Sequence, residues 1–403
     1  MPAKNPLLPR RPILDWSGFK VIDAPLIGSV ERLPHAVFTT SGRAAIYHAL
    51  LQLGTSDRST VLVPSYHCPS MVAPVLLARL NVRYFGLRAD GLPNLATIDE
   101  ATARRAKAMI VSHYFGLAQS LAEVRAWCNA RNVALIEDCA HCYFGEAGDR
   151  PVGAWGDFST ASLSKFFPVP EAGLLASATR PISPIALASP SWNAQFKGWI
   201  DVIETAADHN RVAGLNGGLR LLFSLKNALR SRRWRRAGSN AAPAESQEQA
   251  MMRDCDMARI DDAPLWASML IKSVLPRGRI IALRERNFRQ YAQHFTGVRG
   301  ARPLFALPNT VTAPYVYPLW VDDAQRVYRQ LTAQQMPVFR WDRIWPGVPR
   351  MAGDVGPEWS HHVLQLLCHQ DLCPKDVDCI ASAVLRLLPT PQPTIDRFPL
   401  QHA

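Results

Sequence analysis

The stretch AMIVSHYFGLAQSLAEVRAWCNARNVALIED, residues 108–138, contains the pattern that decides the fold class. Two near-continuous apolar runs, AMIVSHYF at 108–115 and VALIED at 133–138, flank a segment with apolar residues at helical spacing. Strands that are apolar along their whole length are typical of parallel sheets covered by helices on both faces. The stretch therefore predicts a strand, a helix and a second strand of an α/β sheet.

The same alternation extends over the N-terminal half of the chain. Three more apolar runs occur at 36–39, 60–64 and 81–87, and the segments between them carry apolar residues at helical spacing. This pattern predicts a large α/β domain over 14–245 with a mainly parallel sheet. Ligands of such sheets bind beyond the carboxyl ends of the strands, so the residues that end these runs are the first candidates for a site.

A different pattern follows a stretch of small and polar residues, AGSNAAPAESQEQA at 237–250, which predicts a loop or linker. Beyond it, long helix-like material broken near Pro276 leads to the strand-like run YVYPLWV at 315–321 and to a helix-like segment at 373–388. Strands and helices in this order predict a smaller C-terminal α+β domain over 246–403.

Positive charge is concentrated in one segment. The net charge is +12, and seven basic residues with no acidic ones lie between Arg220 and Arg236. The rest of the chain is only mildly basic, so the charge gives little reason to expect a nucleic-acid partner. The segment fits either a solvated basic helix or a surface that attracts a diphosphate group or an anionic membrane.

Composition excludes several classes of protein. With 48% hydrophobic and 19% charged residues, the chain has the balance of a globular protein and not of a disordered one. No run of about 20 apolar residues occurs and no export signal is recognisable, so we expect a cytoplasmic protein. The eight cysteines include one CxxC pair, Cys139 and Cys142, without a second pair at zinc-ribbon spacing. This distribution favours scattered reduced thiols over a metal site.

Two polar clusters follow apolar runs of the large domain. TSGRAA, at 40–45, joins a strand to a helix, and its free N–H groups and Gly42 suit either an anion site or an ordinary helix cap. IEDCAH, at 136–141, places Glu137 and Asp138 at a strand end, where the two carboxylates either contact a ligand or lie in solvent.

A third cluster, SLSKFFP at 162–168, contains Lys165 in a chain with only eight lysines against 37 arginines. Partial burial would lower the pKa of Lys165 and raise the fraction of nucleophilic free amine. The same sequence also fits a surface lysine whose stem covers apolar neighbours. A phosphate cradle, a strand-end aspartate and a lysine are together the parts needed to hold pyridoxal 5'-phosphate (PLP). The three clusters therefore predict a PLP site.

Several stretches resemble, in order and spacing, the sugar aminotransferases of the DegT/StrS-like family, which have the α/β fold of fold-type I PLP-dependent enzymes. The resemblance runs from about Phe19 to Leu388. It rests on TTSGRAAIYHALL (39–51), VLVPSYHCPS (61–70), AMIVSHYFG (108–116), VALIEDCAH (133–141), VGAWGDFSTASLSKFFP (152–168), ARIDDAPLWASML (258–270) and VLQLLCHQDLCPKDVDCI (363–380).

The resemblance implies roles for individual residues. Lys165 is the lysine that binds PLP covalently and acts as general base, and Asp138 pairs with the pyridine nitrogen. His141 stands where the family has a glutamine near the phenolic oxygen of PLP, and we expect its charge to vary near neutral pH. Gly42 and Arg43 offer backbone N–H groups to the phosphate, with Arg43 in place of a threonine.

Two cofactor contacts stay open in the resemblance. The aromatic residue that stacks on the ring in the family falls at Cys68 in an ungapped alignment, which leaves Tyr66 and His67 as alternatives. The hydroxyl that binds the phosphate is that of Thr160, or that of Ser162 if the loop is two residues shorter.

The resemblance also implies an activity and an assembly. The expected reaction transfers an amino group, commonly from glutamate, to a nucleotide-linked keto-sugar in sugar, polysaccharide or natural-product biosynthesis. Arg259 matches a position that reaches the phosphate in the partner subunit, which implies an obligatory homodimer. The alternatives are a non-catalytic or regulatory relative and a sugar dehydration, which would need a residue other than lysine at position 165.

Overall fold

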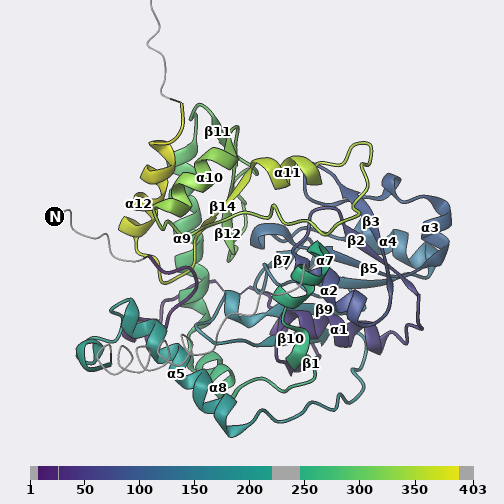
Figure 1. The fold of residues 1–403 in the computed structure, drawn as a ribbon, viewed down its shortest axis with the longest axis horizontal. Coiled ribbons are helices and arrows are strands. Elements are labelled where there is room, and N and C mark those ends of the chain that lie inside the picture. The colour runs from purple at the N-terminus through teal and green to yellow at the C-terminus, as the bar shows by residue number, and fades with distance from the viewer. Residues whose placement is uncertain (1–7, 26, 220–245, 390–403) are drawn as a thin grey trace, which may run out of the picture.

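The strands of the large domain form one sheet, as the apolar runs predicted. The structure is a computed structural model that describes residues 8–25, 27–219 and 246–389 (Figure 1). The strands are β1 (His35–Thr39), β2 (Thr60–Pro64), β3 (Asn81–Leu87), β4 (Pro93–Asn94), β5 (Ala106–Ser112), β6 (Ala134–Asp138), β9 (Phe158–Ser162) and β10 (Gly173–Ser177). Their order is β1-β10-β9-β6-β5-β2-β3-β4. The pairings from β9 to β3 are parallel, so the mainly parallel α/β sheet is confirmed.

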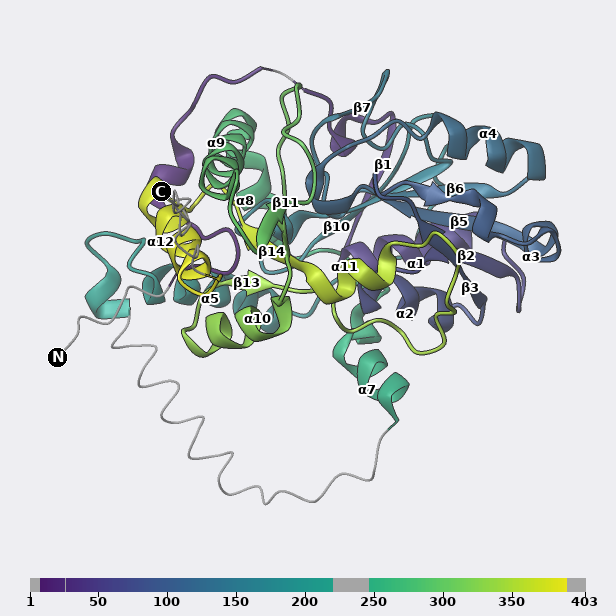
Figure 2. The ribbon, with the colours of Figure 1, turned by 90° about the horizontal axis from the view of Figure 1, so that it is seen from above.

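Helices cover this sheet on both faces. All five residues of β2 are buried, as expected for a strand with protein on either side. The helices between the strands are α1 (Gly42–Gln52), α2 (Pro69–Leu77), α3 (Glu100–Arg105) and α4 (Ala122–Arg131), and a small hairpin is made by β7 (Glu146–Ala147) and β8 (Arg150–Pro151). Figure 2 shows this domain beside the C-terminal helices and strands.

One predicted strand ends earlier than its apolar run. The run at 108–115 continues past β5, but the chain turns at Tyr114–Gly116, where Phe115 has a φ of 61°. The backbone of Tyr315 packs against this turn, because its N–H donates to the Phe115 carbonyl over 2.8 Å. A Cβ atom on Gly116 would lie 2.3 Å from the Tyr315 nitrogen, so glycine is required there. The turn thus brings a distant segment to the carboxyl edge of the sheet.

The C-terminal part has its own antiparallel sheet. Its strands are β11 (Ala301–Pro303), β12 (Val316–Val321), β13 (Val338–Phe339) and β14 (Val363–Leu367), in the order β11-β12-β14-β13. The helices of this part are α9 (Arg277–Phe295), α10 (Ala324–Ala333), α11 (Gly356–His362) and α12 (Pro374–Leu385). The predicted break near Pro276 is confirmed, because α9 begins directly after that residue.

Among the described residues between β10 and α9, the chain forms α5 (Trp192–Asp208), α7 (Gln247–Asp254) and α8 (Trp266–Val274). Met251 and Cys255 pack in the apolar cluster of α1 and α2, although they follow the predicted domain boundary at 245. That boundary stays a prediction, and the basic segment 220–236 lies outside the described residues. No helix in the described ranges has both the length and the apolar character needed to cross a bilayer.

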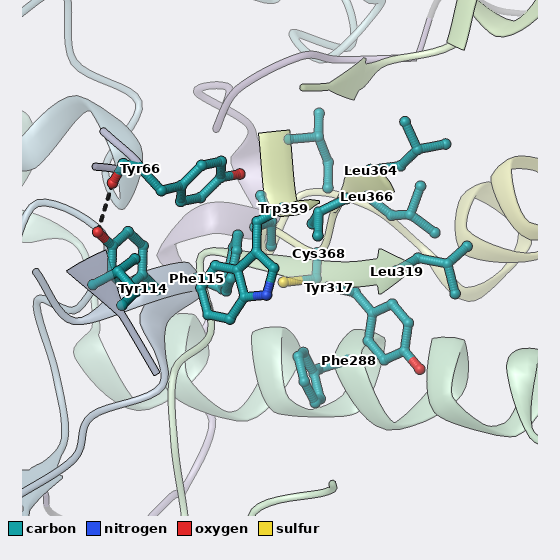
Figure 3. Close-up of a cluster of buried hydrophobic side chains, with 14 of the residues drawn as sticks. Tyr66, Tyr114, Phe115, Phe288, Tyr317, Leu319, Trp359, Leu364, Leu366 and Cys368 are labelled. Carbon is teal, nitrogen blue, oxygen red and sulfur yellow. Dashed lines mark hydrogen bonds between the residues drawn. The ribbon is translucent and has the colours of Figure 1, made fainter. Parts of the chain in front are cut away.

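One apolar core joins the two parts. Tyr66 and Phe115 of the large domain belong to the same buried cluster as Tyr317 and Leu366 of the small domain, with Trp359 between them (Figure 3). The Tyr114 hydroxyl donates to the Tyr66 carbonyl over 2.6 Å and fixes the end of β2 against the turn after β5. The carboxyl edge of the large sheet is therefore held directly against the small domain.

Candidate active site

A cavity of about 230 Å³ lies at the carboxyl ends of the central strands. All three clusters predicted from the sequence contribute to it, since α1 begins here, β6 ends here, and a short 3-10 turn, Leu163–Lys165, follows β9 here. Its lining residues are Ser41, Gly42, Arg43, Ile46, Cys68, Ser70, Met71, Ser112, His113, Asp138, Ala140, His141, Ser162, Ser164, Lys165, Glu171 and Trp341. The three clusters, which are separate along the sequence, therefore lie together in one cavity.

The side chain of Lys165 is partly buried and lines this cavity. Burial lowers the pKa of its amine, and the nearby Cys68 and Asp138 only partly oppose this. Its Nζ lies 5.2 Å from the centre of the Tyr315 ring. A lowered pKa leaves more of the amine neutral at a given pH, which is the form that attacks a carbonyl group.

The side chains of Asp138 and Glu137 face opposite sides of the sheet, because successive residues of a strand alternate between its two faces. The Oδ1 atom of Asp138 accepts from the Ala140 N–H over 3.0 Å, and its Oδ2 accepts from the Ser112 hydroxyl over 3.2 Å. These two bonds fix the carboxylate in the cavity wall. Of the two strand-end acids, Asp138 is therefore the one available to a ligand.

Glu137 is a structural carboxylate, fully buried behind the cavity. It accepts hydrogen bonds from His113 Nε2 over 2.7 Å and from the backbone N–H groups of Gly153, Trp155 and Gly156. The atoms of His113, Glu137 and Cys139 that could bind a metal ion lie within 4.8 Å of one another. Both Glu137 oxygens are already bonded and burial raises the pKa of the Cys139 thiol, so this cluster is poorly suited to a metal ion.

The start of α1 forms one end of the cavity. Ser41 caps the helix by accepting from the Ala44 N–H over 3.2 Å, and the amides of Gly42 and Arg43 have no acceptor within the first turn. A Cβ atom on Gly42 would lie 3.2 Å from the Ser162 Cβ, so the absence of a side chain leaves room beside that hydroxyl. The edge of the helix is thus open to a phosphate-sized group.

Ser162 lines the cavity and Thr160 does not. The Thr160 hydroxyl is buried without a hydrogen-bond partner among the described residues. The side chain of Arg43 is also committed elsewhere, because its Nη2 pairs with Glu171 over 2.7 Å and its Nε donates to the Asp256 carbonyl. The guanidinium of Arg43 is therefore already paired, whereas its backbone N–H lies in the first turn of α1.

The three candidates for ring stacking differ in whether they line the cavity. Tyr66 is fully buried in the core, and His67 is buried with Nδ1 at 2.8 Å from the Pro64 carbonyl and Nε2 accepting from the Trp345 N–H. Neither residue lines the cavity, so neither is placed to stack on a ring bound there. Cys68 lines it, as the ungapped alignment predicted, but brings no aromatic face.

His141 lies between two aromatic rings, Tyr315 at 4.4 Å and Trp341 at 4.8 Å between ring centres. Burial, with a further contribution from the Lys165 ammonium, lowers the pKa of His141 well below its usual value. The expectation that its charge varies near neutral pH is therefore wrong. His141 is a neutral imidazole that can donate one hydrogen bond.

Comparison with known proteins agrees with this site. The model of the DegT/DnrJ/EryC1/StrS aminotransferase family matches residues 29–178, the segment that contains α1, β6 and Lys165. The matched segment is less than half of the chain. The match contains the described lining residues of the cavity except Trp341, and the small domain and the remaining segments lie outside it.

Curated relatives match over a similar part of the chain. A GDP-perosamine synthase of Vibrio cholerae is 24% identical over 133 residues, which are 33% of this chain and 36% of the relative. An L-glutamine:2-deoxy-scyllo-inosose aminotransferase of Micromonospora echinospora is 27% identical over 145 residues, 35% of this chain and 34% of the relative. The chain thus matches about a third of the length of these relatives.

Solved structures have a similar fold over most of the chain. A DegT/DnrJ/EryC1/StrS aminotransferase from Brucella abortus has a TM-score of 0.58 at 16% identity, covering 88% of this chain and 86% of the other. The E. coli GDP-4-keto-6-deoxy-D-mannose-3-dehydratase with bound hydrated PLP has a TM-score of 0.55 at 12% identity, covering 87% of both chains. The chain therefore has the fold of PLP-dependent aminotransferases, as the resemblance implied.

The structure adds two aromatic residues that the sequence did not single out. Trp341 lines the cavity from the loop after β13, and Tyr315 lies beside Lys165 and His141 from the segment before β12. Both come from the small domain. Arg259 lies outside this cavity and pairs with Asp262 over 2.9 Å.

Proposed function

We propose that this chain is a PLP-dependent aminotransferase that moves an amino group from glutamate to a nucleotide-linked keto-sugar. The observation that supports this most is the common cavity of Lys165, Asp138 and the N-terminus of α1. The donor set fits PLP, because an amine, a fixed carboxylate and free backbone amides correspond to its aldehyde, ring nitrogen and phosphate. The space that glycine leaves at position 42 suits the phosphate end.

Each residue of the cavity has a proposed task. The amides of Gly42 and Arg43, with the Ser162 hydroxyl, would bind the phosphate, and Asp138 would hold a proton on the ring nitrogen. Neutral His141 would donate a hydrogen bond to the phenolic oxygen. When bound, PLP supplies a ring that withdraws electrons from the substrate carbon. Lys165, with its lowered pKa, would take a proton from that carbon and return it.

An assay with candidate substrates tests the activity. Nucleotide-linked keto-sugars are screened with glutamate, and the formation of 2-oxoglutarate and of the aminated sugar is followed. Equimolar formation of the two products supports an aminotransferase. Protein that stays colourless with added PLP, or that forms no keto acid, would instead favour the non-catalytic relative. Lys165 gives no support to a dehydration, which needs another residue at this position.

Trp341 is the proposed aromatic wall of the cofactor site, because it is the one Trp, Tyr or Phe among the described lining residues. The Tyr66 ring, 5.3 Å away, and His141 hold the indole in place. Trp341→Ala is expected to weaken PLP binding to the apoprotein about tenfold through lost ring contact, and Trp341→Phe to retain it. Titration of the apoprotein with PLP measures this, with Trp127→Ala on α4 as the control. Equal dissociation constants for wild type and Trp341→Ala would contradict the assignment.

A homodimer is the proposed assembly, with α8 in its interface. Trp266, Leu270 and Val274 form an exposed apolar stripe at intervals of four residues, and Trp192 packs on Trp266 at 5.2 Å. The stripe adjoins the cofactor site, since the Ser268 hydroxyl donates to the Glu171 carbonyl over 2.7 Å. The family resemblance implies that Arg259 reaches the phosphate of the partner subunit in such a dimer.

The interface has a direct test. Leu270→Glu is expected to give particles with the 44.7 kDa mass of one chain, because an ionised carboxylate in the stripe opposes burial. Light scattering after size exclusion measures the mass. Leu77→Glu, at an exposed position on α2, is the matched control and should keep the wild-type mass. A dimeric Leu270→Glu variant would exclude this stripe as the interface.

The cellular location is proposed to be the cytoplasm. All eight cysteines are free thiols and five of them are buried, which is typical of proteins from a reducing compartment. The expected context is the biosynthesis of amino sugars for polysaccharides or natural products.

A further inference from the structure

A second and larger cavity also reaches Lys165. It has a volume of about 780 Å³, within the range of small-molecule sites. Its lining residues are Leu8, Arg10, Arg11, Pro12, Ile13, Ser164, Lys165, Thr205, His209, Tyr315, Thr332, Gln335, Met336, Phe339, Leu367 and His369. Because Ser164 and Lys165 line both cavities, a molecule in the larger one would lie directly beside the reactive amine.

The wall of this cavity includes the N-terminal arm, which we define as residues 8–13. The arm is anchored to the small domain, because the Ile13 N–H donates to Asp371 Oδ2 over 3.1 Å and His369 Nε2 lies 3.1 Å from the Pro9 carbonyl. Burial lowers the pKa of His369 to about 3, so the ring is neutral and its Nε2–H donates to that carbonyl. Ile13 is buried against α5. The arm is therefore a built wall of the cavity and precedes the segment that the family model matches.

The charge of this wall is positive and uncompensated. Neither Arg10 nor Arg11 pairs with a carboxylate of the described residues. Arg11 Nη2 donates to the Thr205 hydroxyl over 3.4 Å, and the Arg10 guanidinium lies 5.7 Å from the centre of the Phe339 ring. The lining that the structure describes contains no Asp or Glu, whereas it contains these two arginines and Lys165. An anionic group is thus the ligand that the wall favours.

We propose that the larger cavity is the acceptor site and that Arg10 and Arg11 bind a phosphate or diphosphate group of the amino acceptor. Guanidinium groups form bidentate, charge-assisted bonds with phosphate oxygens. Met336 and Phe339 supply apolar surface for the uncharged part of the same molecule. The role of Lys165 in this inference rests on the proposed aminotransferase function, whereas the anion site rests on the arm alone.

Calorimetric titration of the PLP-loaded protein tests the anion site. The probes are inorganic pyrophosphate, UDP and GDP, with glutamate as a separate arm that reports on a carboxylate donor. Arg10→Gln/Arg11→Gln is expected to weaken the binding of the diphosphates about tenfold or more, and to leave glutamate binding unchanged. Arg299→Gln/Arg329→Gln removes the same charge from exposed positions outside the cavity and should change each dissociation constant less than about twofold.

Three outcomes would overturn the proposal of an anion site. Equal diphosphate affinity in wild type and Arg10→Gln/Arg11→Gln would exclude the arm as the anion site, as would wild-type protein that binds none of the three diphosphates. A loss confined to glutamate would assign the arginines to the amino donor. Failure of Lys165 to take up PLP would refute the aminotransferase function, while the effect of Arg10→Gln/Arg11→Gln on diphosphate binding would still be measurable.

Discussion

Replacement of Lys165 by alanine is expected to abolish covalent attachment of PLP and to lower turnover by about 10⁴-fold or more, the upper end of what one general base contributes. The reason is that the same amine has two tasks. It would bind the cofactor aldehyde as a nucleophile, and it would move the proton at the substrate carbon. Among the described residues that line the smaller cavity there is no second lysine that could replace it.

Borohydride reduction of the PLP-loaded wild-type protein, followed by peptide mapping, locates the attachment. The label is expected on the peptide that contains Lys165. Lys197→Ala, which removes an exposed lysine of α5, is the control and should be labelled as the wild type is. Because burial lowers the pKa of Lys165, labelling should persist at a lower pH than for an exposed lysine. A label on any other lysine would overturn the assignment.

The location of the smaller cavity was predictable because parallel strands end at one edge of a sheet. Asp138 and Lys165 are 27 positions apart in the printed sequence, but they follow neighbouring strands, β6 and β9. The two-residue period of a strand also explains why Asp138 faces the cavity while Glu137 is buried behind it. A strand-end pattern therefore identifies such residues without knowledge of the tertiary fold.

Contacts that depend on loops or on the small domain could not be predicted in the same way. The residues after β2 leave the strand in a turn, so the sequence did not show that Tyr66 and His67 point into the core while Cys68 lines the cavity. Trp341 comes from a loop without periodicity, and the N-terminal arm reaches the site through anchors on His369 and Asp371, more than 350 positions away. The neutral state of His141 follows from burial, which no local pattern reports.

Asp138→Asn is expected to keep PLP bound but to lower turnover on the order of 10²-fold or more. Asparagine has the same shape, and its amide can still accept from the Ala140 N–H and donate to the Ser112 hydroxyl, so the cavity wall should persist. The amide carries no negative charge, and a proton on the ring nitrogen would lose its ionic partner. The ring would then withdraw electrons less strongly from the substrate carbon.

Steady-state kinetics and the absorption spectrum of the loaded variant separate binding from chemistry. Unchanged PLP affinity with a reduced kcat is the expected combination. Ser112→Ala is the matched control, because it removes one hydrogen bond to the same carboxylate and leaves its charge in place, so its kcat should fall far less. Near-normal turnover in Asp138→Asn would mean that the carboxylate does not act on the ring nitrogen. Loss of PLP together with a lower melting temperature would instead make Asp138 a structural carboxylate, as Glu137 is.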